Sequence, residues 1–318
     1  MQYFLKLFTI SALGFFIITG AKAQMSANPP EISDKIRSMG TKFNRDVIVN
    51  TRKLYGPLMK TMPKDGIDVD KDQSYGTHAR HKLDVFKPQK LSSPVPIVVY
   101  LHGGGFNRGD KKGSFNIGTF FARNGIIGIT ANYRLAPKAN WPAGPEDISG
   151  VIKWIKSNAT KIGGNPNKIF LMGHSAGAGH VAGYAFFEEN QLKDDGVSGV
   201  IFSSLPTFNL ATKVSPEGVL YHPGEKAYFG TNPKKYERMS PSNHVAGRKI
   251  PLYIAYAEFD MPMVQNQNLQ LINAIYKRDK KLPTIKQVQG HNHISIMMHI
   301  NTKDELLGLD LLEFIKTN

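Results

Sequence analysis

Residues 169–177, which read Ile-Phe-Leu-Met-Gly-His-Ser-Ala-Gly, constrain what this chain can fold into more than any other stretch. An apolar run breaks into Gly-His-Ser-Ala-Gly and is followed by a helix-compatible segment, which predicts a strand, a sharp turn and a helix. We expect glycine at both Gly173 and Gly177 because a side chain at either position would clash with the neighbouring strand or helix. The turn would present Ser175 as a nucleophile.

A second strand leads into a run of glycines. Residues 96–101 are continuously apolar and rich in β-branched side chains, as is typical of a strand buried in a parallel sheet. They are followed by His-Gly-Gly-Gly-Phe at residues 102–106, where the glycines leave backbone N–H groups uncovered. A triple glycine could be only a flexible loop. Together with the nucleophile turn, it favours an oxyanion hole made by the N–H groups of Gly103, Gly104 and Ala176.

A carboxylate is expected at the end of a later strand. Residues 250–257 form another buried run, which leads into Glu258-Phe259-Asp260. A carboxylate at this place would orient a histidine and stabilise the imidazolium that forms during catalysis. In an extended segment Glu258 and Asp260 share a face, so periodicity cannot choose between them. We favour Asp260.

A histidine is expected in the loop after the last strand, which we predict over residues 284–289. His291 and His293 both qualify as the general base, and we favour His293. This His-x-His pair could also be half of a metal site. Because no further histidine, cysteine or acidic cluster with ligand spacing accompanies the pair, we expect no metal.

Strands and helices alternate along the rest of the chain. This predicts an α/β fold: a mostly parallel central sheet with helices on both faces and ligands bound at the carboxyl ends of the strands. Residues 82–86 alternate polar and apolar, as an edge strand does. A helix is expected over residues 145–159, where Asp147 would favour the positive end of the helix dipole and play a structural part only.

One segment interrupts the alternation. Residues 205–248 are rich in proline, glycine, tyrosine and lysine and lack a strong periodicity, so we expect a cap-like insertion over the site. The candidate walls of a substrate pocket are Phe208, Leu220, Tyr221 and Tyr228. Aromatic residues that merely pack the insertion onto the body would look the same in the sequence.

The beginning of the chain is typical of an exported protein. Residues 1–23 contain Lys6, an apolar run and the small-x-small sequence Ala21-Lys22-Ala23, which predicts a signal peptide and a mature chain from Gln24. The apolar run is shorter than the roughly 20 residues of a spanning helix, which disfavours an uncleaved anchor and stable membrane insertion. We therefore expect a periplasmic or secreted protein. With no cysteine in the chain, no disulfide can form.

After the predicted signal peptide, residues 24–75 form an arm and residues 76–318 the main α/β domain. Over residues 28–62 the arm has apolar side chains at helical spacing, so it is expected to be helical. Such an amphipathic arm could pack on the outside of the domain or form part of a lid over Ser175. The sequence leaves both roles open.

The chain of 318 residues carries a formal charge of +15. Such a charge could indicate binding to nucleic acid, but the basic residues are scattered, and their densest cluster, residues 277–281, is short. We expect a solvated basic surface and no nucleic-acid partner. Adsorption to an anionic polymer stays open.

These motifs, in this order, resemble the hormone-sensitive-lipase-like branch of the α/β hydrolases. The resemblance rests on residues 102–106, 132–137, 173–177, 258–260 and 293–295 and covers the chain from about residue 75 to the end. It implies a cofactor-free serine hydrolase with Ser175 as nucleophile, His293 as base and Asp260 as orienting acid. The Ala-Glu-Phe-Asp and Gly-His-Asn-His-Ile-Ser sequences further resemble carboxylesterases, arylformamidases and feruloyl-type esterases.

Two departures from that pattern concern the pocket. Ile294 stands where phenylalanine is common, and Met261 separates Asp260 from Pro262. We expect both to reshape the pocket without disabling the three catalytic side chains.

The predicted function is an exported esterase for small or aromatic carboxylic esters. His102, Phe106 and His174 flank the motifs and are candidates for substrate contact. An arylformamidase, a cell-wall esterase and a non-catalytic binding module remain as alternatives. The last is disfavoured because no member of the triad is missing. The sequence names neither the acyl chain, the alcohol nor the oligomeric state.

Overall fold

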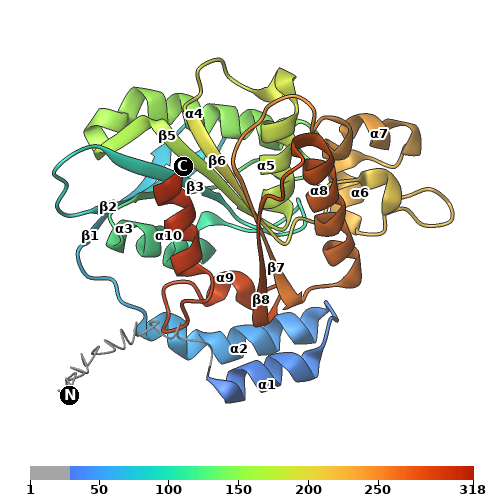
Figure 1. Ribbon diagram of the computed structural model, residues 1–318, viewed down its shortest axis with the longest axis horizontal. Coiled ribbons are helices and arrows are strands. Elements are labelled where there is room, and N and C mark those ends of the chain that lie inside the picture. Colours follow the sequence, from blue (N-terminus) through green and yellow to red (C-terminus); the bar gives the residue numbers. More distant parts are fainter. Residues whose placement is uncertain (1–28) are drawn as a thin grey trace, which may run out of the picture.

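The computed structural model describes residues 29–318, so the predicted signal peptide lies outside the described residues. One eight-stranded sheet runs through the molecule in the order β1-β2-β4-β3-β5-β6-β7-β8 (Figure 1). Strand β2 pairs antiparallel with β1 and β4, and all other pairs are parallel. The strands are β1 (Ile67–Ser74), β2 (Lys82–Pro88), β3 (Val95–Leu101), β4 (Ile127–Ala131), β5 (Gly164–His174), β6 (Val197–Ser203), β7 (Leu252–Phe259) and β8 (Thr284–Asn292).

Helices cover both faces of this sheet, which confirms the predicted fold class. The α-helices are α1 (Pro30–Met39), α2 (Arg45–Thr61), α3 (Phe115–Arg123), α4 (Ala143–Ile162), α5 (Ala176–Phe186), α6 (Pro223–Phe229), α7 (Tyr236–Met239), α8 (Pro262–Asp279), α9 (Ser295–Met298) and α10 (Gly308–Thr317). Short 3-10 helices are η1 (Lys111–Ser114), η2 (Glu188–Asn190), η3 (Leu210–Thr212), η4 (Pro233–Lys235) and η5 (Pro241–Asn243).

The core lies in two layers, one on each face of the sheet. Successive side chains of a strand point to opposite faces, so Val99 and Leu171 pack with α4, α5 and α8, whereas Val98 and Phe170 pack with α3, α9 and α10. All four side chains are fully buried. Continuous apolar runs suit strands that are covered on both faces. This core stabilises the fold without any disulfide.

The prediction that residues 82–86 form an edge strand is wrong. They belong to β2, which lies between β1 and β4 and has a largely buried centre. The edge on this side of the sheet is β1, which lies within residues 24–75, where the sequence predicts only a helical arm. Its sequence Ile-Asp-Val-Asp-Lys-Asp-Gln-Ser is mostly polar, and none of its residues is buried. Charged side chains suit an edge strand because they discourage pairing with other chains, and they also weaken the hydrophobic pattern from which a strand is predicted.

The arm is helical, as expected from its periodicity. Helices α1 and α2 lie beside β8 and α9 (Figure 1). The Asn44 side chain caps α2 by accepting a hydrogen bond from the Val47 N–H (2.9 Å). Ile36 and Tyr55 are fully buried against the main domain. No helix within residues 29–318 has the length and apolar character to cross a membrane.

The segment 205–248 forms short helices around a small core of its own. This core joins Leu210, Leu220 and Tyr228 to Phe106 of the glycine loop. Of the expected pocket walls, Phe208, Leu220 and Tyr228 are buried, whereas Tyr221 is exposed. The segment therefore packs onto the loop that follows β3.

Candidate functional site

A sharp turn between β5 and α5 carries Ser175. The serine has φ +52° and ψ −122°, a conformation that side chains rarely adopt outside functional turns. A Cβ at Gly173 would collide with the carbonyl oxygen of Gly177, and a Cβ at Gly177 would collide with that of Leu101. The predicted reason for both glycines is confirmed. Ser175 is half-buried at the carboxyl edge of the sheet.

Three side chains from distant parts of the chain meet at this edge. His293 Nε2 lies 2.9 Å from Ser175 Oγ, and His293 Nδ1 lies 2.6 Å from Asp260 Oδ1. Asp260 is fully buried, and its other oxygen accepts hydrogen bonds from Ser204 Oγ (2.6 Å) and the Ala257 N–H (2.8 Å). Such a chain can move a proton from the hydroxyl to the imidazole while the carboxylate holds the ring.

The structure separates the two carboxylates that the sequence left in competition. Glu258 lies near the end of strand β7 and accepts a hydrogen bond from the Gly290 N–H (2.7 Å) and another from Arg37 (3.4 Å). Asp260 lies just beyond the strand and contacts His293. Glu258 therefore joins β8 to the arm, and only Asp260 contacts the His293 imidazole.

The glycine loop after β3 lies against Ser175. A Cβ at Gly103 would approach Ser175 Cβ to 3.1 Å, so the missing side chain allows the close approach. Gly104 has φ +138°, a conformation that favours glycine. Within residues 29–318, no hydrogen bond engages the N–H groups of Gly103, Gly104 or Ala176. These groups are free to donate to an oxygen of a bound molecule.

His102 and Phe106, two of the residues expected to touch substrate, face inward. His102 Nδ1 lies 2.7 Å from the Gly103 carbonyl oxygen and its ring stacks on Tyr133. Burial lowers the pKa of His102 to about 4, against the opposing effect of this hydrogen bond. Phe106 is buried and stacks on Tyr228 of the insertion. Both side chains support the glycine loop from behind, and their contact with substrate stays a prediction.

His174 lies next to the imidazole of His293. The two ring centroids are 4.8 Å apart, and His174 Nδ1 lies 3.3 Å from Ser203 Oγ. Burial lowers the pKa of His174 well below its usual value, and the nearby His293 lowers it further. The His174 ring is therefore neutral at pH 7. Its contact with substrate also stays a prediction.

Sequence reasoning missed Phe43 as a part of this site. Phe43 lies in the loop between α1 and α2, and its ring meets the His293 ring edge to face at 5.1 Å. In the sequence, Phe43 is one apolar position among several in the arm. No local signal distinguishes it, since its partner lies 250 positions further along the chain.

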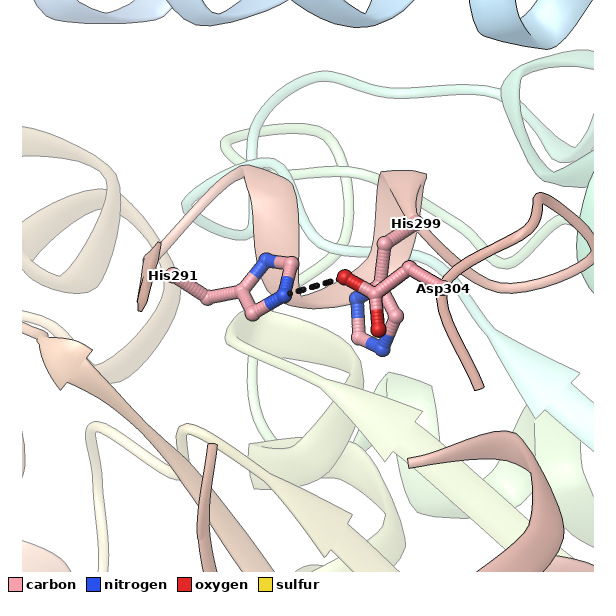
Figure 2. Close-up of side chains that lie close together, drawn as sticks. All are labelled: His291, His299 and Asp304. Atoms are coloured by element: carbon pink, nitrogen blue, oxygen red, sulfur yellow. Dashed lines mark hydrogen bonds and ion pairs between the residues drawn. The ribbon is translucent and has the colours of Figure 1, made fainter. Parts of the chain in front are cut away.

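His291 belongs to a separate buried cluster. It points toward Asp304, with Nε2 3.0 Å from Oδ2, and His299 lies beside the carboxylate (Figure 2). The expectation that no further potential metal ligand accompanies His291 is wrong, because one ligand atom from each of these three residues lies within 4.8 Å of the others. No local pattern in the sequence indicates this cluster, because His299 and Asp304 follow α9 and only the fold brings them to His291.

The geometry of this cluster favours hydrogen bonding over a metal centre. The His291 and His299 rings are tilted at 34° with centroids 4.1 Å apart. His291 Nε2 and Asp304 Oδ2 are already joined by a hydrogen bond of 3.0 Å. His299 Nδ1 also lies 3.1 Å from the Ser295 carbonyl oxygen. That the protein works without a metal stays a prediction.

Comparisons with known proteins agree with this fold. The structure superimposes on Bacterial Heroin Esterase with a TM-score of 0.69 at 20% identity, over 92% of this chain and 98% of that one. It superimposes on Esterase B from Lactobacillus Rhamnosis with a TM-score of 0.69 at 16% identity, over 90% and 95% of the two chains. At these identities the likeness shows a shared fold.

Curated relatives match parts of the chain. Isoprenylcysteine alpha-carbonyl methylesterase ICME of Arabidopsis thaliana is 32% identical over 139 residues, which are 43% of this chain and 32% of the relative. Esterase LipQ of Mycobacterium tuberculosis is 24% identical over 236 residues, which are 70% of this chain and 55% of LipQ. The matches thus span about a third to half of these relatives.

A family model matches more than half of the chain and identifies its family. The BD-FAE model matches residues 83–275, which run from β2 into α8 and include the glycine loop, Ser175 and Asp260. The resemblance to the hormone-sensitive-lipase-like α/β hydrolases is confirmed by this match together with the shared fold. The chain therefore belongs to the BD-FAE family and has the α/β-hydrolase fold.

Proposed function

We propose that this protein is an exported serine hydrolase that cleaves carboxylic esters of small or aromatic substrates. Ser175 is the nucleophile, His293 the general base and Asp260 the acid that orients the imidazole. The observation that carries the proposal is the continuous pair of hydrogen bonds from Ser175 Oγ through His293 to the buried Asp260. The methylesterase and esterase names of the curated relatives support the same chemistry.

The reaction follows from this geometry. As Ser175 Oγ attacks the acyl carbon, His293 Nε2 takes the hydroxyl proton and Asp260 stabilises the imidazolium. His293 then gives that proton to the oxygen of the departing alcohol, which leaves an acyl group on Ser175. A water molecule, deprotonated by His293, attacks this acyl-enzyme and releases the carboxylic acid and the free serine.

The N–H groups of Gly103, Gly104 and Ala176 form the oxyanion hole. They stabilise the negative oxygen of both tetrahedral intermediates, and each such donor is typically worth about 100- to 1000-fold in turnover. The loop needs no movement to reach Ser175, since Gly103 already lies against it.

Export and substrate class rest on other observations. Export rests on the character of residues 1–23 and agrees with the lack of cysteine, because no thiol is exposed to oxidation. The preference for small or aromatic esters rests on the resemblance to carboxylesterases and feruloyl-type esterases. The aromatic ring of Phe43 beside His293 is compatible with such substrates.

The test is hydrolysis of p-nitrophenyl esters from acetate to laurate, methyl ferulate and N-formylkynurenine by the protein from Gln24 onward. We expect turnover of short or aromatic esters that Ser175→Ala abolishes. Asp260→Asn should lose about 10⁴-fold in kcat, as expected for an imidazole in the wrong tautomer. Glu258→Gln is the matched control, and it should keep kcat within about tenfold because Glu258 does not touch His293.

Two results would count against this function. If the folded wild type hydrolyses no ester faster than Ser175→Ala does, the protein is a binding module on a hydrolase fold. If N-formylkynurenine is hydrolysed far faster than every ester, the protein is an arylformamidase that uses the same three side chains.

A further inference from the structure

The loop that presents His293 is held from within by the residue before it. The Asn292 side-chain oxygen accepts hydrogen bonds from the N–H groups of Ile294 and Ser295, both at 3.0 Å. The Asn292 N–H donates to Ser295 Oγ, also at 3.0 Å. These bonds fix the backbone on both sides of His293. The position of the imidazole therefore depends on Asn292 and Ser295.

Ser295 in turn rests on a buried histidine and carboxylate. Ser295 Oγ lies 3.1 Å from His291 Nδ1, and His291 Nε2 lies 3.0 Å from Asp304 Oδ2. The Asp304 carboxylate accepts a hydrogen bond from His291 Nε2, and His291 Nδ1 faces the Ser295 hydroxyl. Burial raises the pKa of Asp304, but the hydrogen bond from His291, the nearby rings of His299 and His291 and the Leu306 N–H together outweigh burial and keep the pKa below its usual value. The pair thus sets the direction of the Ser295 hydroxyl.

The other end of the network lies in the arm. Asn292 Nδ2 donates to Thr51 Oγ1 of α2 at 2.8 Å, and the Tyr55 hydroxyl of the same helix lies 3.3 Å from His291 Nδ1. Thr51 and Tyr55 are one helical turn apart, so they face the loop together. Both are fully buried, as is His291. The contacts join residues about 240 positions apart in the chain.

Because this network is buried, its hydrogen bonds determine the position of the loop that carries His293. A buried polar group that loses its partner is costly, so the members of a buried network hold one another in a single arrangement. Three hydrogen bonds of this network involve the backbone on either side of His293. None of its side chains contacts Ser175 or Asp260 through a hydrogen bond among the described residues.

We propose that Asn292, Ser295, His291 and Asp304, together with Thr51 and Tyr55 of α2, form a positioning network for His293. The inference rests on the proposed function, in which His293 is the general base. It makes the arm a fixed support of the catalytic histidine rather than a lid that moves away. The contact of Phe43 with the His293 ring lies at the same junction of arm and loop.

Thr51 offers a matched pair of variants. Thr51→Val keeps the shape but removes the acceptor for Asn292 Nδ2, whereas Thr51→Ser keeps the hydroxyl. We expect Thr51→Val to lower kcat about 10- to 100-fold with KM within about twofold, the scale that a displacement of about 1 Å produces. Thr51→Ser should restore most of kcat. Tyr55→Phe is the second variant, for use if Thr51→Val does not fold, and it should lower kcat in the same way.

A readout that does not depend on hydrolysis accompanies the kinetics. The proton between His293 Nδ1 and Asp260 should give a far-downfield proton resonance, because their separation is 2.6 Å. We expect this signal to shift or broaden in Thr51→Val and to persist in Thr51→Ser. If the wild type hydrolyses no ester, the proposed function fails, and loss of the signal in Thr51→Val would still support the positioning role.

Two results would contradict the positioning role of this network. A folded Thr51→Val or Tyr55→Phe protein with unchanged kcat and an unchanged resonance would overturn the inference, even if its thermal midpoint falls. Such a result would mean that the network only stabilises the fold. Metal in the purified protein, lost together with kcat in Asp304→Asn, would also overturn it, because the cluster would then be a metal site.

Discussion

Acidification should destabilise this protein well above the pH at which its carboxylates titrate. Burial lowers the pKa of His102 to about 4 and those of His180 and His299 to about 3. All three rings are at most 5% exposed, and the described residues offer His180 no hydrogen-bond partner at either ring nitrogen. In the unfolded chain each would titrate near the ordinary histidine pKa of about 6.5.

Proton linkage gives the sign and size of the change in the free energy of unfolding with pH. Below pH 6.5 the unfolded chain binds protons that the folded protein does not, so the free energy of unfolding falls as the pH falls, until the folded pKa values near 3 to 4 are reached. Each histidine costs about 1.4 kcal/mol per pH unit, so the three together cost about 4 kcal/mol per unit. A typical domain has about 5–15 kcal/mol in total, so unfolding is expected within roughly one to four units below pH 6.5.

Urea unfolding at pH 7, 6 and 5 measures this slope. His180→Leu removes one of these buried titrating rings without adding a polar group, and should lower the slope by up to about 1.4 kcal/mol per pH unit. His78→Gln is the matched control, because His78 is exposed rather than buried. Equal free energies of unfolding at pH 7 and pH 5 would refute the reasoning, as would an unaltered slope in His180→Leu.

Two further predictions concern stability. Gly177→Ala should destabilise the fold by about 3 kcal/mol or more, since its Cβ would collide with the Leu101 carbonyl oxygen, whereas Gly113→Ala, which meets nothing within 4 Å, should change thermal unfolding little. Lys213→Met should cost about 3–5 kcal/mol because it leaves the buried Glu225 unpaired, and adding Glu225→Leu should recover most of that loss. A double variant no more stable than Lys213→Met would contradict the second prediction, and a Gly177→Ala protein with the wild-type melting temperature would contradict the first.

The sequence predicted those parts of the fold that depend on local composition. β3 and β5 are apolar and β-branched because both of their faces are covered, and the glycines around Ser175 are required by contacts within two adjacent elements. β1 escaped prediction for the opposite reason. An edge strand can be polar on both faces, so neither alternation nor an apolar run marks it.

The local sequence pattern cannot tell whether Glu258 or Asp260 contacts the catalytic histidine. In an extended strand the two side chains would share a face, but β7 ends at Phe259, and the chain turns before Asp260. The turn carries one carboxylate to His293 and leaves the other with Gly290. Strand ends depend on tertiary contacts, so no count along the sequence could have separated the two residues.

His291 and His293 have similar partners but different positions in the fold. His291 and His293 are two positions apart and both end in contact with an aspartate, His293 with Asp260 and His291 with Asp304. One histidine reaches Ser175 and the other is sealed inside, with its Nδ1 turned to Ser295. The two histidine–aspartate pairs differ in the serine that each histidine contacts, Ser175 for His293 and Ser295 for His291. If the His291–Asp304 pair positions His293, then His291→Gln should lower kcat without abolishing it, whereas His293→Gln should abolish it. If kcat falls equally in both variants, the two histidines act as one catalytic unit. His291 would then not be a residue that only positions His293.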